Sequence, residues 1–270
     1  MVKIIDIHCH LTFEDYDSDR EQVIEACKQE LKGVVTSGVD PEDAKKALEL
    51  ACLHEGFVFA SLGLHPIHVV GKTDQEIGDY QEFISINKRR IVSIGEIGLD
   101  YHWVRDPIKI KRTREVFEEF LELSKELDLP VVLHLRGTSG GEAIEDGLKL
   151  ISDADIKKAV FHCFTGKPQL AERICEEGYY VSLPTSIVRS KSMKKVAKRI
   201  PLLYLFTETD SPYLSPKEDE KRNVPQHVKV VYEEIARQKK SDVETVEEAI
   251  ESNFERVFGV EIKNRTVPPD

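Results

Sequence analysis

Two histidines separated by one residue follow the first apolar run of the chain, and their spacing suits metal binding. The run begins at Ile4 and meets His8 and His10 within a few positions. In a strand the side chains alternate between two faces, so both imidazoles point to the same side. Imidazole nitrogens are common ligands of divalent cations. The pair therefore predicts a cation site at the end of a first strand.

Further histidines and acids stand where later β-branched runs end, at Glu96, His134, His162 and Asp210. Any one of them has a simple structural explanation, because a histidine there can bond a loop carbonyl and an acid can cap a helix. Gathered together, such polar groups are costly to bury unless a cation organises them. Six side chains exceed one four-coordinate site that keeps a position for water, which indicates two cations with Glu96 as the bridge. The predicted ligands are His8, His10, Glu96, His134, His162 and Asp210.

Short β-branched runs alternate with helical patterns along all 270 residues, which is typical of βα units and a parallel sheet. Eight units match a single-domain (β/α)8 TIM barrel, whereas an open doubly wound sheet usually carries a Gly-rich turn after its first strand. In such a barrel the carboxyl ends of all strands meet at one mouth. The predicted strands are Ile4 to His8, Gly33 to Ser37, Val58 to Leu62, Ile91 to Gly95, Val131 to His134, Ala159 to His162, Tyr179 to Leu183 and Leu203 to Thr207.

The end of the chain predicts an additional helix and a tail. Asp242 to Phe258 has the pattern of a C-terminal helix outside the barrel, and Glu261 to Asp270 contains two prolines. We therefore expect a barrel domain over residues 1–260 and a C-terminal tail over residues 261–270.

Composition narrows the class of protein. The net charge of −11 argues against a general nucleic-acid coat protein, which normally carries a basic face. No segment approaches the roughly 18 apolar residues of a membrane span, and no signal peptide is recognisable. Five cysteines without a CxxC pair suit a reducing compartment, so we expect a cytoplasmic protein with no membrane association and no obligate protein partner. Cys27, Cys52, Cys163 and Cys175 are expected to be core residues, with Cys163 turned away from the barrel mouth.

Seven short motifs stand in order along nearly the whole chain. They are His8-Cys-His10, Gly63-Leu-His65-Pro66, Gly95-Glu96-Ile-Gly98-Leu-Asp100-Tyr101, His162-Cys163-Phe-Thr-Gly166, Glu208-Thr-Asp210-Ser-Pro212-Tyr-Leu214, Arg222-Asn-Val-Pro225 and Asn253-Phe-Glu-Arg256-Val-Phe258. This ordered set resembles the TatD family of metal-dependent deoxyribonucleases, within the amidohydrolase-like TIM barrels. The resemblance implies two divalent metal ions and hydrolysis of phosphodiester bonds in nucleic acids.

The resemblance also implies how the ligands are divided. One metal would be held by His8, His10, Glu96 and Asp210, and the other by Glu96, His134 and His162. The mixed donors leave Zn, Mg or Mn open. One loop departs from the family pattern, because His134-Leu-Arg136 is followed here by Gly137-Thr-Ser-Gly-Gly141 and not by an acidic helix start. Substrate contacts from that loop are therefore not carried over.

Other residues at the mouth are candidates for proton transfer and substrate binding. Asp210 would accept the proton of a metal-activated water, with Glu208 as its partner or an alternative base, unless Glu208 only caps a helix or forms a salt bridge. His65 would donate to a substrate phosphate or only fix its turn. Arg136 and Arg222 would clamp phosphate or pair with acids.

Aromatic and basic side chains near the mouth have two interpretations each. Stacking on nucleobases and packing within a loop are both open to Tyr101, His102, Trp103 and Tyr213. The stripe that begins at Lys191 is more simply a solvated helix face than a track for a strand.

The function predicted from these residues is a metal-dependent hydrolase, most specifically a deoxyribonuclease acting on DNA as single strands or at 3′ ends. The alternative is an amidohydrolase-type esterase, lactonase or cyclic amidase that uses the same two-metal centre. Members of that wider class often bridge their metals with a carboxylated lysine, and the predicted fourth strand has none, which favours the nuclease. A barrel that binds without catalysis is the third hypothesis.

Overall fold

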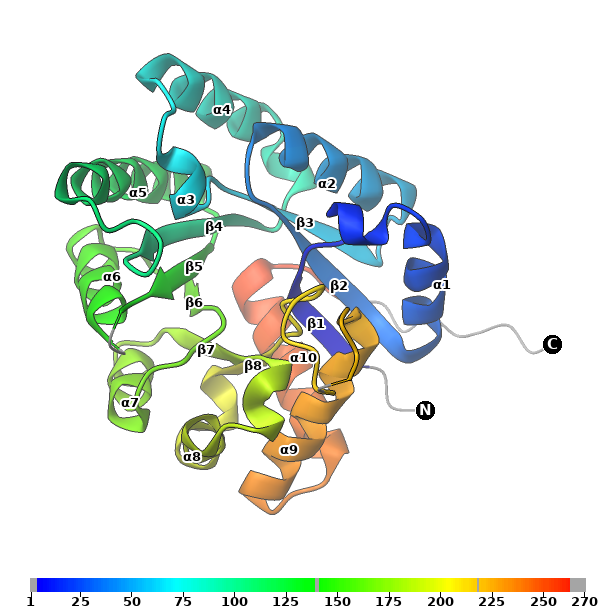
Figure 1. The fold of residues 1–270 in the computed structure, drawn as a ribbon. Helices are drawn as coiled ribbons and strands as arrows, with labels where there is room; N and C mark the ends of the chain where they lie inside the picture. Colours follow the sequence, from blue (N-terminus) through cyan, green and yellow to red (C-terminus); the bar gives the residue numbers. More distant parts are fainter. Residues whose placement is uncertain (1–3, 139–140, 218, 263–270) are drawn as a thin grey trace.

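Eight parallel strands form one sheet in the computed structural model, which describes residues 4–138, 141–217 and 219–262. Each strand is hydrogen-bonded to the next one in the chain, in the order β1 to β8. Figure 1 shows the sheet curling round until β8 returns to β1, with helices outside it. The predicted (β/α)8 barrel is confirmed. The strands are β1 (Ile4–Cys9), β2 (Leu31–Gly38), β3 (Val58–Leu62), β4 (Ser93–Asp100), β5 (Val131–Arg136), β6 (Ala159–Phe161), β7 (Tyr180–Leu183) and β8 (Leu205–Thr207).

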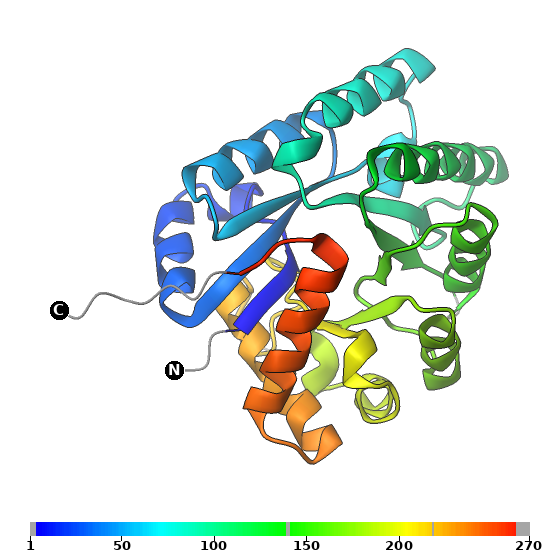
Figure 2. The ribbon, with the colours of Figure 1, turned by 180° about the vertical axis from the view of Figure 1, so that it is seen from behind.

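Helices follow the strands and cover the outside of the barrel. The final one packs against α9 and against β1 and β8, and Figure 2 shows it nearest the viewer when the barrel is seen from behind. The predicted C-terminal helix is therefore present, with Asp242 as its cap. The helices are α1 (Arg20–Glu30), α2 (Pro41–Leu53), α3 (Pro66–Val69), α4 (Asp74–Ile86), α5 (Pro107–Leu127), α6 (Glu142–Asp153), α7 (Pro168–Glu176), α8 (Lys191–Arg199), α9 (Lys229–Lys239) and α10 (Val243–Phe258).

Local sequence explains where several helices begin and which face they bury. The Asp40 carboxylate accepts the backbone N–H groups of Glu42 and Asp43, which would otherwise have no partner at the start of α2. In α5 the buried residues recur at helical spacing and include Phe117 and Phe120. Each such side chain contributes about 1.5–3 kcal/mol through burial. These contacts hold α5 against the sheet, and α5 packs mainly on β4.

Side chains complete the closure between β8 and β1. Cys9, the last residue of β1, forms one parallel bridge with Ser211, which lies beyond the end of β8. On the Ile5 side, the Tyr232 hydroxyl from α9 accepts the Ile5 N–H at 3.0 Å and donates to the Ile5 carbonyl at 3.2 Å. The Thr207 hydroxyl donates to the same carbonyl at 3.2 Å. Buried backbone groups that lack a ladder partner are thereby satisfied by hydroxyl groups.

Every strand except β3 differs from its predicted bounds, by one or two residues at either end except at the end of β4. β4 extends past the predicted end at Gly95 to Asp100, because its second half pairs with β5 up to Asp100 opposite Arg136. β8 begins at Leu205 and not at Leu203, because Leu202–Tyr204 forms one turn of 3-10 helix after Pro201.

The cysteines divide between the core and the surface. Cys27 and Cys175 are buried, as predicted. Cys52 is exposed on the outer face of α2, so its prediction as a core residue is wrong. Helical spacing alone did not distinguish the edge of the buried face from the outside.

The ends of the chain complete the description. Of the predicted tail over residues 261–270, residues 263–270 lie outside the described part of the structure. Among the described residues, no helix combines the length and the apolar character that crossing a membrane requires.

Candidate metal centre

The two histidines of β1 point into the same buried space at the mouth of the barrel. His8 and His10 are both buried, and their Nε2 atoms lie 3.3 Å apart. Asp210, just after β8, places its Oδ1 atom 3.7 Å from His8 Nε2 and 3.4 Å from His10 Nε2. Strand alternation and the closure of the barrel thus bring three possible ligands together from opposite ends of the chain.

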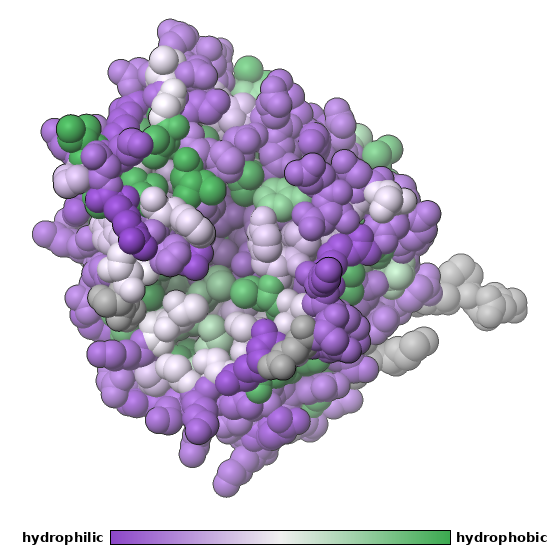
Figure 3. Space-filling view, in the orientation of Figure 1, coloured by the Kyte–Doolittle hydropathy of each residue, from purple (hydrophilic) through white to green (hydrophobic). Residues whose placement is uncertain are grey.

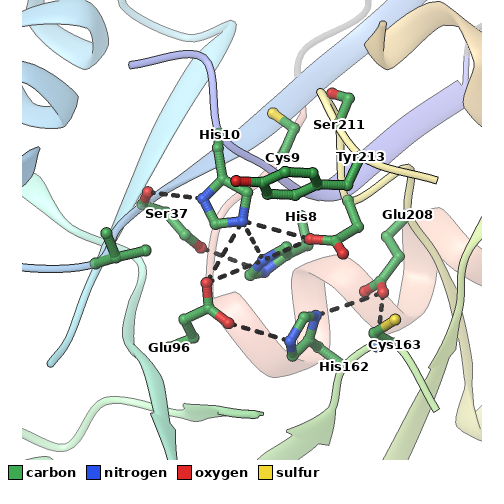
Figure 4. Close-up of polar contacts among 12 residues, drawn as sticks. His8, Cys9, His10, Ser37, Glu96, His162, Cys163, Glu208, Ser211 and Tyr213 are labelled. Carbon is green, nitrogen blue, oxygen red and sulfur yellow. Dashed lines mark hydrogen bonds and ion pairs between the residues drawn. The ribbon is translucent and has the colours of Figure 1, made fainter. Parts of the chain in front are cut away.

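Glu96 stands between this group and a second pair of histidines. Its Oε1 atom lies 3.6 Å from His8 Nε2 and 3.4 Å from His10 Nε2. Its Oε2 atom lies 3.2 Å from His134 Nδ1 and 3.1 Å from His162 Nε2, and those two nitrogens are 3.3 Å apart. Figure 4 shows the labelled rings and the Glu96 carboxylate pointing toward one another. Each oxygen of Glu96 therefore faces its own pair of histidines.

The outward nitrogens of the β1 histidines are held by a single residue of β2. His8 Nδ1 lies 3.2 Å from the Ser37 hydroxyl, and His10 Nδ1 lies 3.4 Å from the Ser37 carbonyl oxygen. A carbonyl oxygen only accepts, so His10 carries its proton on Nδ1 and leaves the lone pair of Nε2 facing the centre. Such outer partners fix the tautomer of metal-binding histidines.

Carboxylates hold the outward nitrogens of the other two histidines. His134 Nε2 donates to Asp100 Oδ2 at 3.0 Å. His162 Nδ1 lies 3.5 Å from Glu208 Oε1, and the same oxygen accepts the Cys163 backbone N–H at 2.6 Å. The outward nitrogens of both rings thus face carboxylates, so that in a neutral ring the inward nitrogen would be left free to bind a cation beside Glu96.

Burial and neighbouring charges act differently on the members of the cluster: at His134 and His162 burial acts to lower the pKa, but the neighbouring carboxylates together outweigh it and raise the pKa of both rings. Burial alone would raise the pKa of Glu96, but neighbouring histidines, His65 and His8 foremost, hold it well below its usual value. Burial lowers the pKa of His8 and so favours the neutral ring. At His10 burial also acts to lower the pKa, but the hydrogen bond with Asp210 and the charges of Glu96 and Asp210 together outweigh it and raise the pKa. An ionised carboxylate beside a neutral imidazole is the state in which both can act as ligands.

A buried carboxylate joins the two ends of the chain beneath these ligands. Asp6 accepts the Thr209 hydroxyl at 2.6 Å, the Thr209 N–H at 2.9 Å and the His8 N–H at 3.2 Å. It therefore ties the backbone that carries His8 to the backbone that carries Asp210.

His65 lies at the rim of the centre with its tautomer fixed. Its Nδ1 atom accepts the Ile67 backbone N–H at 3.3 Å, so the neutral ring carries its proton on Nε2. Burial lowers the pKa of His65 to about 3, which keeps the ring neutral. Nε2 lies 3.8 Å from Glu96 Oε2. Although His65, Asp100 and His134 are close enough to surround an ion, His65 presents a donor there and not a lone pair.

The two candidate arginines lie in different surroundings. Arg136 is exposed and lines the cleft above the centre, with its guanidinium carbon 5.9 Å from the centroid of the Trp103 ring. Arg222 instead forms a two-pronged ion pair with Asp19, at 2.7 and 2.6 Å, and lies over the Tyr16 ring. The structure brings Arg136 to the centre, whereas Arg222 takes the alternative of pairing with an acid.

Cys163 differs from its predicted position. It is partly exposed, has a positive φ of 45°, and lines a small pocket of about 230 Å³ that also contains Arg136 and Asp210. The prediction that it turns away from the mouth is wrong, because β6 ends at Phe161 and strand alternation does not continue to Cys163. Burial raises the pKa of its thiol well above the usual value, so it is not an activated nucleophile.

Three supporting residues escaped the sequence-based prediction. Asp100, Ser37 and Asp6 each bond a histidine of the cluster, or its backbone, from outside. Asp100 lies in the same motif as Glu96, only four residues later, and Asp6 lies two residues before His8. Their spacing was visible, but nothing in it distinguished an outer partner from a ligand.

The chemistry of the donor set fits divalent cations. Four imidazole nitrogens and two carboxylates converge at one end of a barrel, and each ring's outward nitrogen faces a second group. Nitrogen and oxygen donors of this kind suit divalent transition metals. The cluster opens into a cleft of about 560 Å³, which has room for a substrate beside the ions.

Comparison with known proteins assigns the chain to a family. The sequence model of TatD related DNases matches residues 5–259. The chain belongs to the TatD related DNase family. This TatD protein is 38% identical over 257 residues to a metal-dependent hydrolase of Methanocaldococcus jannaschii, which covers 95% of this chain and 97% of that protein. It is 32% identical over 266 residues to a deoxyribonuclease of Homo sapiens, covering 95% of each.

A solved structure extends the similarity to three dimensions. The TatD homologue of Escherichia coli superposes on this chain with a TM-score of 0.86 at 26% identity, covering 96% of this chain and 99% of that one. The family resemblance inferred from the motifs and the TIM barrel are both confirmed.

Proposed function

We propose that this TatD protein is a metal-dependent deoxyribonuclease that hydrolyses phosphodiester bonds in DNA, with single strands or 3′ ends as its substrate. The observation that carries the proposal is the Glu96 cluster, in which two pairs of inward histidine nitrogens face the two oxygens of one carboxylate. The similarity to a human deoxyribonuclease supports the choice of substrate.

In this proposal the side chains hold two cations. His8, His10, Glu96 and Asp210 would hold the first, and Glu96, His134 and His162 the second. Divalent ions such as Zn²⁺, Mn²⁺ or Mg²⁺ supply Lewis acidity, which lowers the pKa of water and neutralises charge on a phosphoryl oxygen.

Asp210 is the acid best placed to accept the proton of the attacking water. Its side chain is 16% exposed in the cleft, whereas the side chain of Glu96 is 3% exposed and that of Glu208 is fully buried. Glu208 also accepts the Cys163 N–H. We therefore assign Glu208 the task of orienting His162, and Asp210 the task of holding the proton.

Two side chains would position the phosphate. The fixed Nε2–H of His65 is a neutral donor at the rim of the cluster and would donate to a non-bridging oxygen. The exposed guanidinium of Arg136, which lines the same cleft, would add charge-assisted hydrogen bonds. Neither group needs to change its protonation state near neutral pH.

Turnover assays on defined substrates test the proposal. Purified protein loaded with Mn²⁺, Mg²⁺ or Zn²⁺ is incubated with end-labelled single- and double-stranded oligonucleotides and, separately, with carboxylic esters, lactones and cyclic amides. A double variant with His8→Ala and His162→Ala is the control for contaminating nucleases. We expect cleavage of the oligonucleotides that disappears in the variant. Turnover of only the esters, lactones or amides would assign the amidohydrolase-type function instead.

A further inference from the structure

Large apolar side chains are exposed along one wall of the cleft. Ile67, in α3, is 42% exposed, and Trp103, in the loop between β4 and α5, is 66% exposed. Both line the same cleft as the metal cluster. Figure 3 shows apolar side chains gathered beside the central hollow, over α3. Exposed apolar surface next to a reaction centre commonly marks a place where a ligand binds.

The loop that carries Trp103 is fixed to the metal cluster by one carboxylate. Asp100 Oδ1 accepts the backbone N–H groups of His102 and Trp103, each at 2.9 Å, while Oδ2 accepts His134 Nε2 at 3.0 Å. The His102 ring also contacts the Trp103 ring edge-to-face, with centroids 4.8 Å apart. The indole is therefore both exposed and held at a set position relative to His134.

The other aromatic residues near the mouth have different surroundings. The Tyr101 hydroxyl donates to Asp146 at 2.6 Å, so that ring is part of the packing between β4 and α6. Tyr213, in the segment after β8, also lines the cleft and is 54% exposed, and its ring centroid lies 6.4 Å from that of His10. Of the aromatic residues in the β4 to α5 loop, Trp103 is the one whose ring faces the cleft.

We propose that Trp103 binds the nucleobase of the nucleotide whose phosphate lies at the metal centre, by stacking on its ring. The proposal rests on the deoxyribonuclease function proposed above. The Arg136 guanidinium lies 5.9 Å from the centroid of the Trp103 ring and lines the same cleft as His134, so its charge would be within reach of the phosphate of a nucleotide whose base stacks on Trp103. A flat π-system stacks on indole, and a neutral alkyl ester would leave the Arg136 charge without a partner.

The subsite selects for unpaired nucleotides. In a duplex both faces of a base are covered by neighbouring base pairs, so it offers no free face to an indole. A single strand or a frayed end offers such a face, and each stacked base contributes through ring contact independent of its sequence.

Kinetics of ring variants test the subsite. Substrates are an oligothymidylate and an abasic oligomer of equal length, built on tetrahydrofuran, which keeps the phosphodiesters but has no bases. We expect Trp103→Ala to raise KM for oligothymidylate roughly 5- to 150-fold and to leave KM for the abasic oligomer unchanged. Trp103→Phe should recover most of the loss. Ile86→Ala is the control, because Ile86 is 75% exposed at the far end of α4.

The outcomes separate the two proposals. If the wild-type protein cleaves oligothymidylate and Trp103→Ala has the same KM, the subsite is wrong and the nuclease function stands. Equal losses on both oligomers would also refute it, because they would indicate a structural role for the ring. If the wild-type protein cleaves no oligonucleotide, the proposed function itself fails.

Binding can also be followed without turnover, since Trp103 is the single tryptophan of the chain. The Mg²⁺-loaded protein is titrated with thymidine 5′-monophosphate and with 2-deoxyribose 5-phosphate, neither of which contains a diester. We expect saturable quenching of tryptophan emission by the nucleotide and none by the sugar phosphate. Identical responses to the two ligands would contradict base stacking on Trp103.

Discussion

Removal of the Asp100 carboxylate should weaken the second cation site and spare the first. The Asp100→Ala substitution deletes the acceptor of His134 Nε2 at 3.0 Å and frees the ring to rotate or change tautomer. A hydrogen bond to a charged group contributes about 1.5–3 kcal/mol, which corresponds to roughly 10- to 150-fold in an equilibrium constant. Mutations of such outer partners typically cost about 10- to 100-fold in metal affinity. We therefore expect a loss of about 10- to 100-fold.

Isothermal titration calorimetry of the chelator-treated protein with Mn²⁺ measures this effect. Two binding events are expected in the wild-type protein, and in Asp100→Ala only one of them should weaken, because His8, His10 and Asp210 do not bond Asp100. Asp100→Asn is the isosteric comparison: it keeps one accepting oxygen where Asp100 uses two, one for His134 and one for the backbone N–H groups of His102 and Trp103, so it should recover only part of the affinity. Two unchanged events in Asp100→Ala would refute the assignment of Asp100 as the residue that positions His134.

Three further predictions concern phosphate binding, barrel closure and pH. Arg136→Ala should raise KM for an oligonucleotide about 10-fold or more in a steady-state assay, because a charge-assisted contact with phosphate is lost. Arg222→Ala should leave KM unchanged in the same assay, because Arg222 pairs with Asp19. The opposite ranking of the two variants would reverse the roles assigned to these arginines. Tyr232→Phe should lower the free energy of unfolding by about 1–3 kcal/mol, because the Ile5 N–H loses its acceptor. Unfolding in urea measures this change, and an unchanged midpoint of the urea transition would contradict the role of the Tyr232 hydroxyl in closing the barrel. The pKa of His65 is about 3 in the folded protein, so below about pH 6.5 the unfolded chain binds a proton that the folded chain does not. The free energy of unfolding of the metal-free protein should therefore fall by up to about 1.4 kcal/mol per pH unit as the pH drops from 6.5 toward 3. The fall should be less steep in His65→Asn, and parallel curves for the two proteins would contradict this prediction.

The barrel and the position of its polar cluster were accessible from sequence because the signal is repeated. Each strand is a short apolar run, and a histidine or acid follows several of them at the same point, so errors of a few residues in a boundary do not move the cluster. His8 and His10 illustrate this, because alternation in one strand already places them on one face. Family motifs then supplied the division into two cation sites, which remains a prediction.

Features that depend on neighbours in space were not accessible. The extension of β4 to Asp100 comes from its pairing with β5, which places Asp100 opposite Arg136. Whether Arg222 met phosphate or an acid depended on Asp19, 203 positions away in the chain. The direction of Cys163 depended on where β6 stops. In each case a single sequence offers both outcomes, and the tertiary fold selects one.

The hydrogen-bond ladder between β8 and β1 is incomplete, so a cation bound at this site would also help to hold the barrel closed. His8 and His10 lie on one side of that join and Asp210 lies on the other. An ion bound by all three would therefore cross-link β1 to the segment that follows β8. The hydrogen bonds between Asp6 and Thr209, 203 positions apart in the sequence, already link the two sides of this join next to the site. Binding the ion would therefore add one more link across this join, and removing it would leave the Asp6–Thr209 hydrogen bonds, the hydroxyl groups of Tyr232 and Thr207, and the backbone hydrogen bonds that His10 and Asp210 donate across the join. Any ligand that binds only the closed ring stabilises it by RT ln(1 + L/Kd), where L is the concentration of free ligand.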